Sequence, residues 1–192
     1  MLNFEMFIES ENSKSIKLSY RKDAPELLEK WAILALNEPE KYKFLLNGDW
    51  TCIKNQQEDN WNSNYLFVEK DGEPIGYICY TMKRPQQFPS ENGLFILPEY
   101  WGYDVPMVAL KKWADMMLLE RNYHKLVLTS HPENTHLYSI LEEASKVGLR
   151  KVGTFKNHVL LIDNNYYDQS IFELSREDYI KELKRIKEGS QE

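Results

Sequence analysis

The fold is decided by residues 91–110, whose sequence is Glu-Asn-Gly-Leu-Phe-Ile-Leu-Pro-Glu-Tyr-Trp-Gly-Tyr-Asp-Val-Pro-Met-Val-Ala-Leu. Four consecutive apolar residues, Leu94 to Leu97, predict a strand that is buried on both faces. Pro98 ends this strand because it has no N–H to donate to a neighbouring strand. A helical pattern begins at Val105. Because the first N–H groups of a helix lack intrahelical partners, a buried strand that leads into a helix commonly forms an anion site.

A carboxylate lies at the start of this helix, where an anion would otherwise bind. Asp104 is expected to act as the N-cap, so its side chain would satisfy the N–H groups that a phosphate needs. Its charge would also repel a phosphate, by roughly 1–4 kcal/mol near the surface. Pro106 contributes no N–H at all. The sequence therefore predicts an anion site that these two residues have weakened.

Composition and charge argue against several classes of protein. The 192 residues suit one domain with a sizeable core, so we expect a single domain over 1–192, with 1–14 as an N-terminal extension and 175–192 as a C-terminal helix. The net charge of −6, without a long basic run, argues against nucleic-acid binding. No apolar run approaches the ~20 residues of a membrane span. The two cysteines, Cys52 and Cys79, are too few to form a disulfide framework. The expected compartment is the cytoplasm.

Hydrophobic periodicity predicts the other elements of the chain. Strands are expected at 16–20, 65–69, 75–82, 125–129, 149–162 and 166–174. Helices are expected at 24–36, 39–47, 105–121, 137–147 and 175–192. Residues 83–90 are expected to be a loop. The pattern also allows a helix at 50–61 and an edge strand at 2–6, without deciding either.

Turn and cap residues support these boundaries. Asp71-Gly72 and Asn164-Asn165 predict tight hairpin turns, because these residues tolerate a positive φ. Gly148 predicts a helix end, and Asp23 and Ser175 predict N-caps. The element order predicts an α/β (α+β) fold, with a mixed sheet and helices on its faces.

Three passages resemble the GCN5-related N-acetyltransferase (GNAT) family, in its ribosomal-protein-alanine and spermidine acetyltransferase-like branch. They are residues 65–80, 91–102 and 163–168. The resemblance implies a mixed, mostly antiparallel twisted sheet of six to seven strands with helices on both faces. The resemblance implies acetyl-CoA as co-substrate, with its pantetheine arm lying between the fourth and fifth strands. It implies cofactor contacts from the backbone at the end of the fourth strand, from the loop that follows it, and from an asparagine before the next helix. These positions are Phe95, Ile96, Leu97, Gly102, Tyr103, Asp104, Val105 and Asn134.

The chain departs from the family pattern at two places. The pyrophosphate loop of the family needs glycine at two positions that are here Asp104 and Pro106. The family also often has a tyrosine, as the acid for the leaving thiolate, at the position of Ala144. Tyr138 could replace it only if the helix register shifts. Glu91 is the candidate general base, against the alternative of a solvated carboxylate at a strand edge.

Histidine and surface residues give weaker indications. His131 and His136 are five residues apart, a spacing that does not place both on one helix face, so no metal site is predicted. Two function hypotheses remain. One is an acyl-CoA-dependent N-acyltransferase that acetylates an amine of a small molecule or peptide. The other is a catalytically silent GNAT fold that has lost the pyrophosphate site and serves binding or regulation. No membrane or nucleic-acid partner is expected, and a homodimer is left open.

Overall fold

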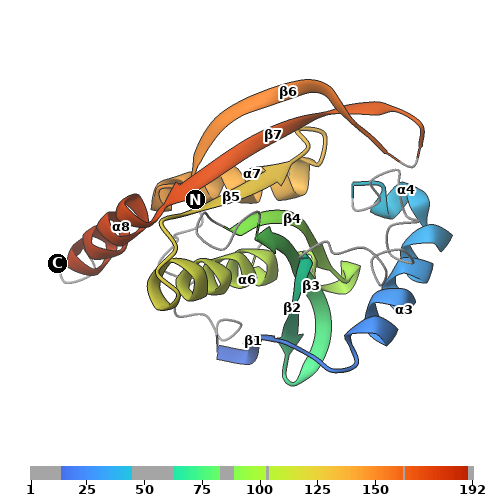
Figure 1. Ribbon diagram of the computed structural model, residues 1–192, viewed down its shortest axis with the longest axis horizontal. Coiled ribbons are helices and arrows are strands. Elements are labelled where there is room, and N and C mark those ends of the chain that lie inside the picture. Colours follow the sequence, from blue (N-terminus) through green and yellow to red (C-terminus); the bar gives the residue numbers. More distant parts are fainter. Residues whose placement is uncertain (1–13, 45–62, 83–88, 103, 162, 190–192) are drawn as a thin grey trace.

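One twisted sheet organises the computed structural model, which describes residues 14–44, 63–82, 89–102, 104–161 and 163–189 (Figure 1). Within these ranges, seven strands pair in the order β1-β2-β3-β4-β5-β7-β6. The strands are β1 (Ile16–Ser19), β2 (Ser63–Lys70), β3 (Glu73–Met82), β4 (Pro89–Ile96), β5 (Lys125–Ser130), β6 (Arg150–Leu160) and β7 (Tyr166–Ser175). Every pair is antiparallel except β4 with β5, which is parallel. The predicted mixed, mostly antiparallel sheet is confirmed.

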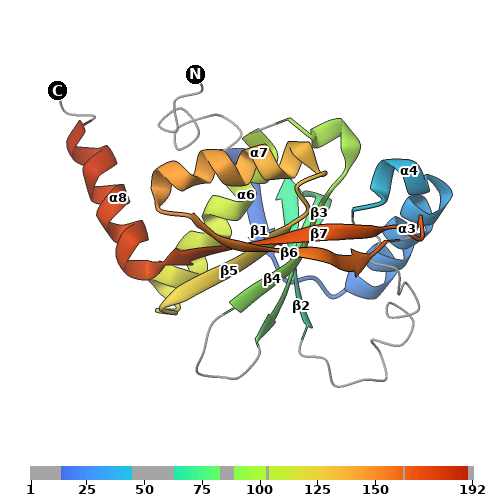
Figure 2. The same ribbon diagram turned by 90° about the horizontal axis from the view of Figure 1, so that it is seen from above.

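Helices cover both faces of the sheet, as predicted (Figure 2). The described helices are α3 (Ala24–Asn37), α4 (Pro39–Tyr42), α6 (Asp104–Ala114), α7 (Thr135–Glu143) and α8 (Arg176–Gly189), with short turns η1 (Pro98–Tyr100), η2 (Asp115–Glu120) and η3 (Ala144–Val147). Each of these helices, within the described ranges, is too short or too polar to span a bilayer.

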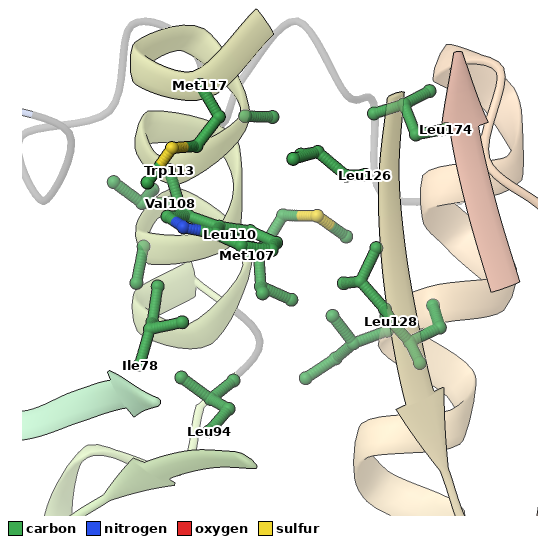
Figure 3. Packing of buried hydrophobic residues seen from close by; sticks show 14 of the residues in the cluster. Ile78, Leu94, Met107, Val108, Leu110, Trp113, Met117, Leu126, Leu128 and Leu174 are labelled. Carbon is green, nitrogen blue, oxygen red and sulfur yellow. The ribbon is translucent and has the colours of Figure 1, made fainter. Parts of the chain in front are cut away.

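The larger core lies between the sheet and α6, α7 and α8. Side chains of α6, among them Met107 and Leu110, point across to Leu126 and Leu128 of β5 (Figure 3). Trp113 is fully buried in the middle of this layer. A second, aromatic cluster packs α3 and α4 on the opposite face. Since neighbouring residues of β4 alternate between the two clusters, both faces of this strand are buried, as the apolar run predicted.

The tight turns follow the sequence prediction. Asp71 and Gly72 have φ of 54° and 90°, and Asn164 has φ of 59°. Gly148 has φ of 92° and ends the helical segment after η3. The Ser175 hydroxyl accepts a hydrogen bond from the Asp178 N–H at 3.0 Å, which confirms that N-cap.

Several boundary predictions are wrong. β4 begins at Pro89, inside the predicted loop. The helix predicted to run to 121 changes to π geometry in η2, where the Arg121 N–H bonds to the Met116 carbonyl five residues earlier. Asp23 is the N-cap of α3, as predicted, but its carboxylate binds Arg21 and makes no capping hydrogen bond. The stretches at 2–6 and 50–61, and most of the loop 83–90, lie outside the described residues.

Asp104 is not the N-cap that the sequence predicted. α6 begins at Asp104 itself, so this residue belongs to the first turn of the helix. A carboxylate in the first turn still interacts favourably with the positive end of the helix dipole. The electrostatic part of the argument against an anion therefore stands.

Candidate functional site

The sheet opens between β4 and β5. Among the described residues, these strands are paired only at Ser90 and Val127, although β4 continues to Ile96 and β5 to Ser130. On its other edge β4 stays paired with β3 up to Ile96. One extra residue, Asn92, interrupts that register between Glu91 and Gly93. Such a bulge bends its strand, and this one lies directly after the last β4–β5 pair, where the two strands separate.

Only alternate backbone groups of β4 face this gap. The Leu97 N–H donates to the Ile75 carbonyl of β3 at 2.8 Å. Since hydrogen-bonded and non-bonded pairs alternate in an antiparallel ladder, Phe95 also bonds to β3, whereas the N–H and C=O of Ile96 point away from it. Of the three predicted backbone contacts to a cofactor, Ile96 is therefore the one whose groups are directed toward β5.

A neighbouring indole already uses one of these groups. The Trp101 Nε1–H donates to the Ile96 carbonyl over 2.6 Å. The turn η1 holds Trp101 in place, because the Trp101 N–H bonds to the Pro98 carbonyl at 3.1 Å. A ligand that donates to the Ile96 carbonyl must share it with the indole or displace it.

A cleft of about 250 Å³ lies at the open end of the gap. Its walls come from the end of α4, the gap-facing residues of β4, the start of α6 and the start of α7. The lining residues are Lys41, Tyr42, Phe44, Leu94, Ile96, Trp101, Pro106, Glu133, Asn134, Thr135, His136, Leu137 and Ile140. Their mixture of apolar side chains with a few polar groups is typical of a small-molecule site.

The start of α6 borders this cleft. Pro106 is buried and lines it, and Val105 is buried beside it in the core. A Cβ at Gly102 would meet no atom within 4 Å, so the backbone there is open to a ligand. Tyr103 lies outside the described residues. The roles of Gly102, Asp104 and Val105 in binding phosphate stay predictions.

Asn134 forms the opposite wall of the cleft and is the N-cap of α7. Its side-chain oxygen accepts a hydrogen bond from the Leu137 N–H at 3.4 Å. Its own N–H donates to the His131 carbonyl at 2.9 Å. These bonds fix the position of Asn134 beside the cleft, as its predicted role in binding a cofactor requires.

The two catalytic candidates lie in different surroundings. Glu91 is in β4 opposite Tyr80, directly after the last β4–β5 pair; the structure describes its backbone but not its side chain. Tyr138 is on α7 and does not line the cleft. Its hydroxyl accepts a hydrogen bond from Lys151 of β6 at 2.7 Å, and its ring packs edge-on against Phe172. The position of Glu91 suits a general base at the gap, whereas the contacts of Tyr138 direct it toward β6.

His131 is a buried residue whose place the sequence did not reveal. It follows β5 and is 7% exposed. Its Nδ1 lies 2.9 Å from the Asp168 carbonyl, which can only accept, so Nδ1 carries the proton in this bond. Burial lowers the pKa of the imidazole below its usual value. Among the described residues no cluster of His, Cys, Asp or Glu could hold a metal ion.

Comparisons with known proteins agree with this geometry. The family model described as "Acetyltransferase (GNAT) family" matches residues 30–142. A spermidine N-acetyltransferase from Vibrio cholerae, solved with CoA and spermine, has a TM-score of 0.70 at 14% identity over 87% of this chain and 99% of that one. A probable acetyltransferase has a TM-score of 0.65 at 15% identity, over 85% and 94%.

A ribosomal-protein-S5-alanine acetyltransferase from Vibrio fischeri is more distant, with a TM-score of 0.52 at 17% identity over 67% of this chain and 69% of that one. Identities this low show a shared fold and no more. Among curated protein sequences, none matches the chain.

Proposed function

This chain belongs to the acetyltransferase (GNAT) family, whose members transfer an acetyl group from acetyl-CoA to an amine, and we propose that it carries out this reaction in the gap between β4 and β5. The single observation that carries the proposal is the parting of these two strands after Ser90 and Val127. It leaves the Ile96 backbone groups facing an open cleft, so an extended amide chain could bond to β4 as an additional strand would.

The residues of the cleft fit the pantetheine arm of acetyl-CoA. The arm is an extended chain with amide groups, and β4 offers it the N–H and C=O of Ile96 between apolar walls. Leu94 and Ile140 would contact its methylene groups, and Asn134 would lie beside it. At the start of α6 the fit is poorer, because Asp104 is an anion near the place proposed for the pyrophosphate. We therefore propose that β4 supplies most of the binding.

For the chemical step we propose Glu91 as the general base. The amine nitrogen forms a bond to the thioester carbonyl carbon, the C–S bond breaks, and the products are the N-acetyl amide, the CoA thiolate and the one proton that the nitrogen loses. Glu91 follows the last β4–β5 pair, so it lies where the gap begins and where the reacting groups would meet. A carboxylate there would accept the proton of the amine, directly or through water.

The leaving thiolate would take its proton from water. Ala144 stands where the family often has a tyrosine, and the Tyr138 hydroxyl is bonded to Lys151. We propose a small-molecule amine as the acceptor, by analogy with the structural neighbour solved with CoA and spermine. Asp104 and Ala144 are the two residues that speak for the alternative of a catalytically silent protein, whereas the family match favours the enzyme.

We also propose a cytoplasmic location. The two cysteines of the sequence, Cys52 and Cys79, are too few for a disulfide framework. Proteins of the reducing cytosol rarely carry disulfides. A homodimer stays a prediction.

The test combines binding with turnover. Calorimetry with acetyl-CoA and with CoA should give binding of both. Acetyl-CoA at ~100 times its Kd should stabilise the fold by about 2.7 kcal/mol in a thermal-shift experiment. Thiol release in the presence of primary amines measures transfer, and Glu91→Gln should lower kcat with little change in the Kd of acetyl-CoA. Absence of both binding and thiol release would refute the proposed function.

A further inference from the structure

A small cavity lies in the larger core, on the side of β5 that faces α6 and α7. Its volume is about 40 Å³. Figure 3 shows part of its wall, where Met107 and Leu110 of α6 point toward Leu126 and Leu128 of β5. The other walls come from α7, η3, β7 and α8, among them Ala144 at the start of η3. The cavity shares no lining residue with the 250 Å³ cleft, so it is a separate space.

Only apolar atoms line this cavity. Lys111 and Tyr179 contribute carbon atoms to it, because their polar ends both donate to the Asp115 carboxylate, over 2.6 and 2.7 Å. Apolar cavities stay dry and can bind apolar ligands. A cavity of roughly 10–15 Å³ holds one water molecule, which is about as large as a methylene group. The cavity therefore has room for about three methylene groups.

On two helices the cavity begins one residue beyond the cleft. Pro106 of α6 lines the cleft, and Met107 lines the cavity. In the same way, Ile140 of α7 lines the cleft, and Leu141 lines the cavity. Both spaces therefore lie in one layer, between the same face of the sheet and the same two helices. Met107 is unbranched and flexible, so it can adapt to a chain that passes from the cleft into the cavity.

The cavity lies next to the point where β4 and β5 part. Leu126 and Leu128, which line it, flank Val127, and Val127 pairs with Ser90 of β4. The cleft lies on the open side of this pair, toward the end of β4. A thioester at the parting point, where Glu91 is proposed to act, would have its pantetheine arm in the cleft. Its acyl group would then point along the same layer toward the cavity.

We propose that this cavity binds the acyl chain of donors longer than acetyl-CoA, so that the protein also transfers linear acyl groups of up to about five carbons. The inference rests on the proposed function, because it needs the pantetheine arm in the gap. The amine nitrogen bonds to the thioester carbonyl carbon, the C–S bond breaks, and the products are the N-acyl amide, the CoA thiolate and one proton. An acetyl group leaves the cavity empty, whereas a butyryl group brings two more methylene groups. Burying each of them should improve affinity roughly four-fold.

The test compares acetyl-CoA, butyryl-CoA and octanoyl-CoA by calorimetry and by thiol release with hexylamine. The Kd of the wild type for butyryl-CoA should be roughly 15-fold lower than for acetyl-CoA. Octanoyl-CoA should lose this gain, because its chain is longer than the cavity. Ala144→Leu fills the cavity and should abolish the preference for butyryl-CoA, whereas Ser145→Leu, at an exposed position of η3, is the matched control and should keep it. If circular dichroism shows that Ala144→Leu does not fold, Val147→Ala replaces it, and its deeper cavity should favour hexanoyl-CoA over butyryl-CoA.

Equal or weaker binding of butyryl-CoA than of acetyl-CoA to the wild type would overturn the inference and leave the cavity a packing void. So would a folded Ala144→Leu variant that keeps the preference, or a Val147→Ala variant that does not move it toward hexanoyl-CoA. If acetyl-CoA binds and reacts while butyryl-CoA does not, the inference fails and the proposed function stands. If none of the three thioesters binds or releases thiol, the proposed function fails, and the inference fails with it.

Discussion

The two edges of β4 have opposite properties, although they belong to the same eight residues. The edge toward β3 is paired from Pro89 to Ile96, and Gly76 allows the close approach of the two backbones. The edge toward β5 is paired only at Ser90. Backbone groups on the first edge bond to β3, whereas those of Ile96 on the second edge face the cleft, where the Trp101 indole bonds to the carbonyl. A sheet can therefore provide a binding site where two neighbouring strands are paired over only part of their length, and the site then needs no specialised side chains.

The largest expected effect comes from breaking the closed edge. A Cβ at Gly76 would lie 2.1 Å from the Phe95 carbonyl oxygen, which is backbone and cannot move alone. Gly76→Val should therefore destabilise the protein by about 3 kcal/mol, measured by urea unfolding. Gly93→Ala is the control, since a Cβ there meets nothing within 4 Å. Equal stabilities for the two variants would show that the β3–β4 edge is not tightly constrained.

The next largest effect is expected at Asp104, the acidic residue at the start of α6. Asp104→Asn removes an anion from the first turn of α6 and should strengthen acetyl-CoA binding by about 2 kcal/mol if the pyrophosphate lies there, since two charges near the surface interact by roughly 1–4 kcal/mol. Calorimetry at low and high salt measures it, because screening should reduce the gain. Glu99→Gln removes an exposed charge from the preceding turn and should have little effect. An unchanged Kd in Asp104→Asn would place the pyrophosphate elsewhere.

A smaller gain is expected at the open edge itself. Trp101→Phe keeps an aromatic ring but removes the N–H that occupies the Ile96 carbonyl. If a pantetheine amide needs that carbonyl, the Kd for acetyl-CoA should fall about five-fold, the value of one hydrogen bond of about 1 kcal/mol. Tyr100→Phe, in the same turn, serves as the control. No difference between the variants would mean that indole and ligand share the carbonyl, which has two lone pairs.

The smallest expected effect is a pH dependence of the free energy of unfolding, which arises in the part of the sheet formed by β5, β7 and β6. Hydrogen bonding to Arg150, with a further contribution from Lys125, lowers the pKa of Glu173 in the folded state. Because the pKa of Glu173 is lower in the folded state, the unfolded chain binds the proton first as pH falls. The contribution of the Glu173 ion pairs to the free energy of unfolding is therefore complete above the unfolded pKa of 4.5 and is lost as pH falls through the folded pKa. Glu173→Gln should flatten the fall in unfolding free energy below pH 4.5. An unchanged slope in urea unfolding would contradict this.

Much of the fold could be predicted because its signals are local. The turns at Asp71-Gly72 and Gly148 follow from residues that tolerate a positive φ, and they are found with φ of 54°, 90° and 92°. The apolar run at 94–97 predicted a strand buried on both faces, and Leu94, Phe95 and Ile96 are buried. The start of β4 at Pro89 and the π turn in η2 were missed, because pairing partners and packing decide them.

The candidate site also has features that the sequence predicted and features that only the structure shows. Glu91, Ile96, Gly102 and Asn134 were named from their likeness to a family motif, and the structure places Ile96 and Asn134 at one cleft. Whether these residues bind acetyl-CoA stays a prediction. The bond from Trp101 to the Ile96 carbonyl could not be predicted, because it depends on the geometry of η1.

The sequence by itself determined the order of the elements, the turns and the charge at the start of α6, since these depend on neighbours within a few residues. Only the tertiary structure decided where β4 and β5 part and which backbone groups face the gap. It also brought His131 and Tyr167 together. The reason is physical: propensity and capping act over a single turn, whereas register and the meeting of distant side chains depend on the packing of the whole sheet.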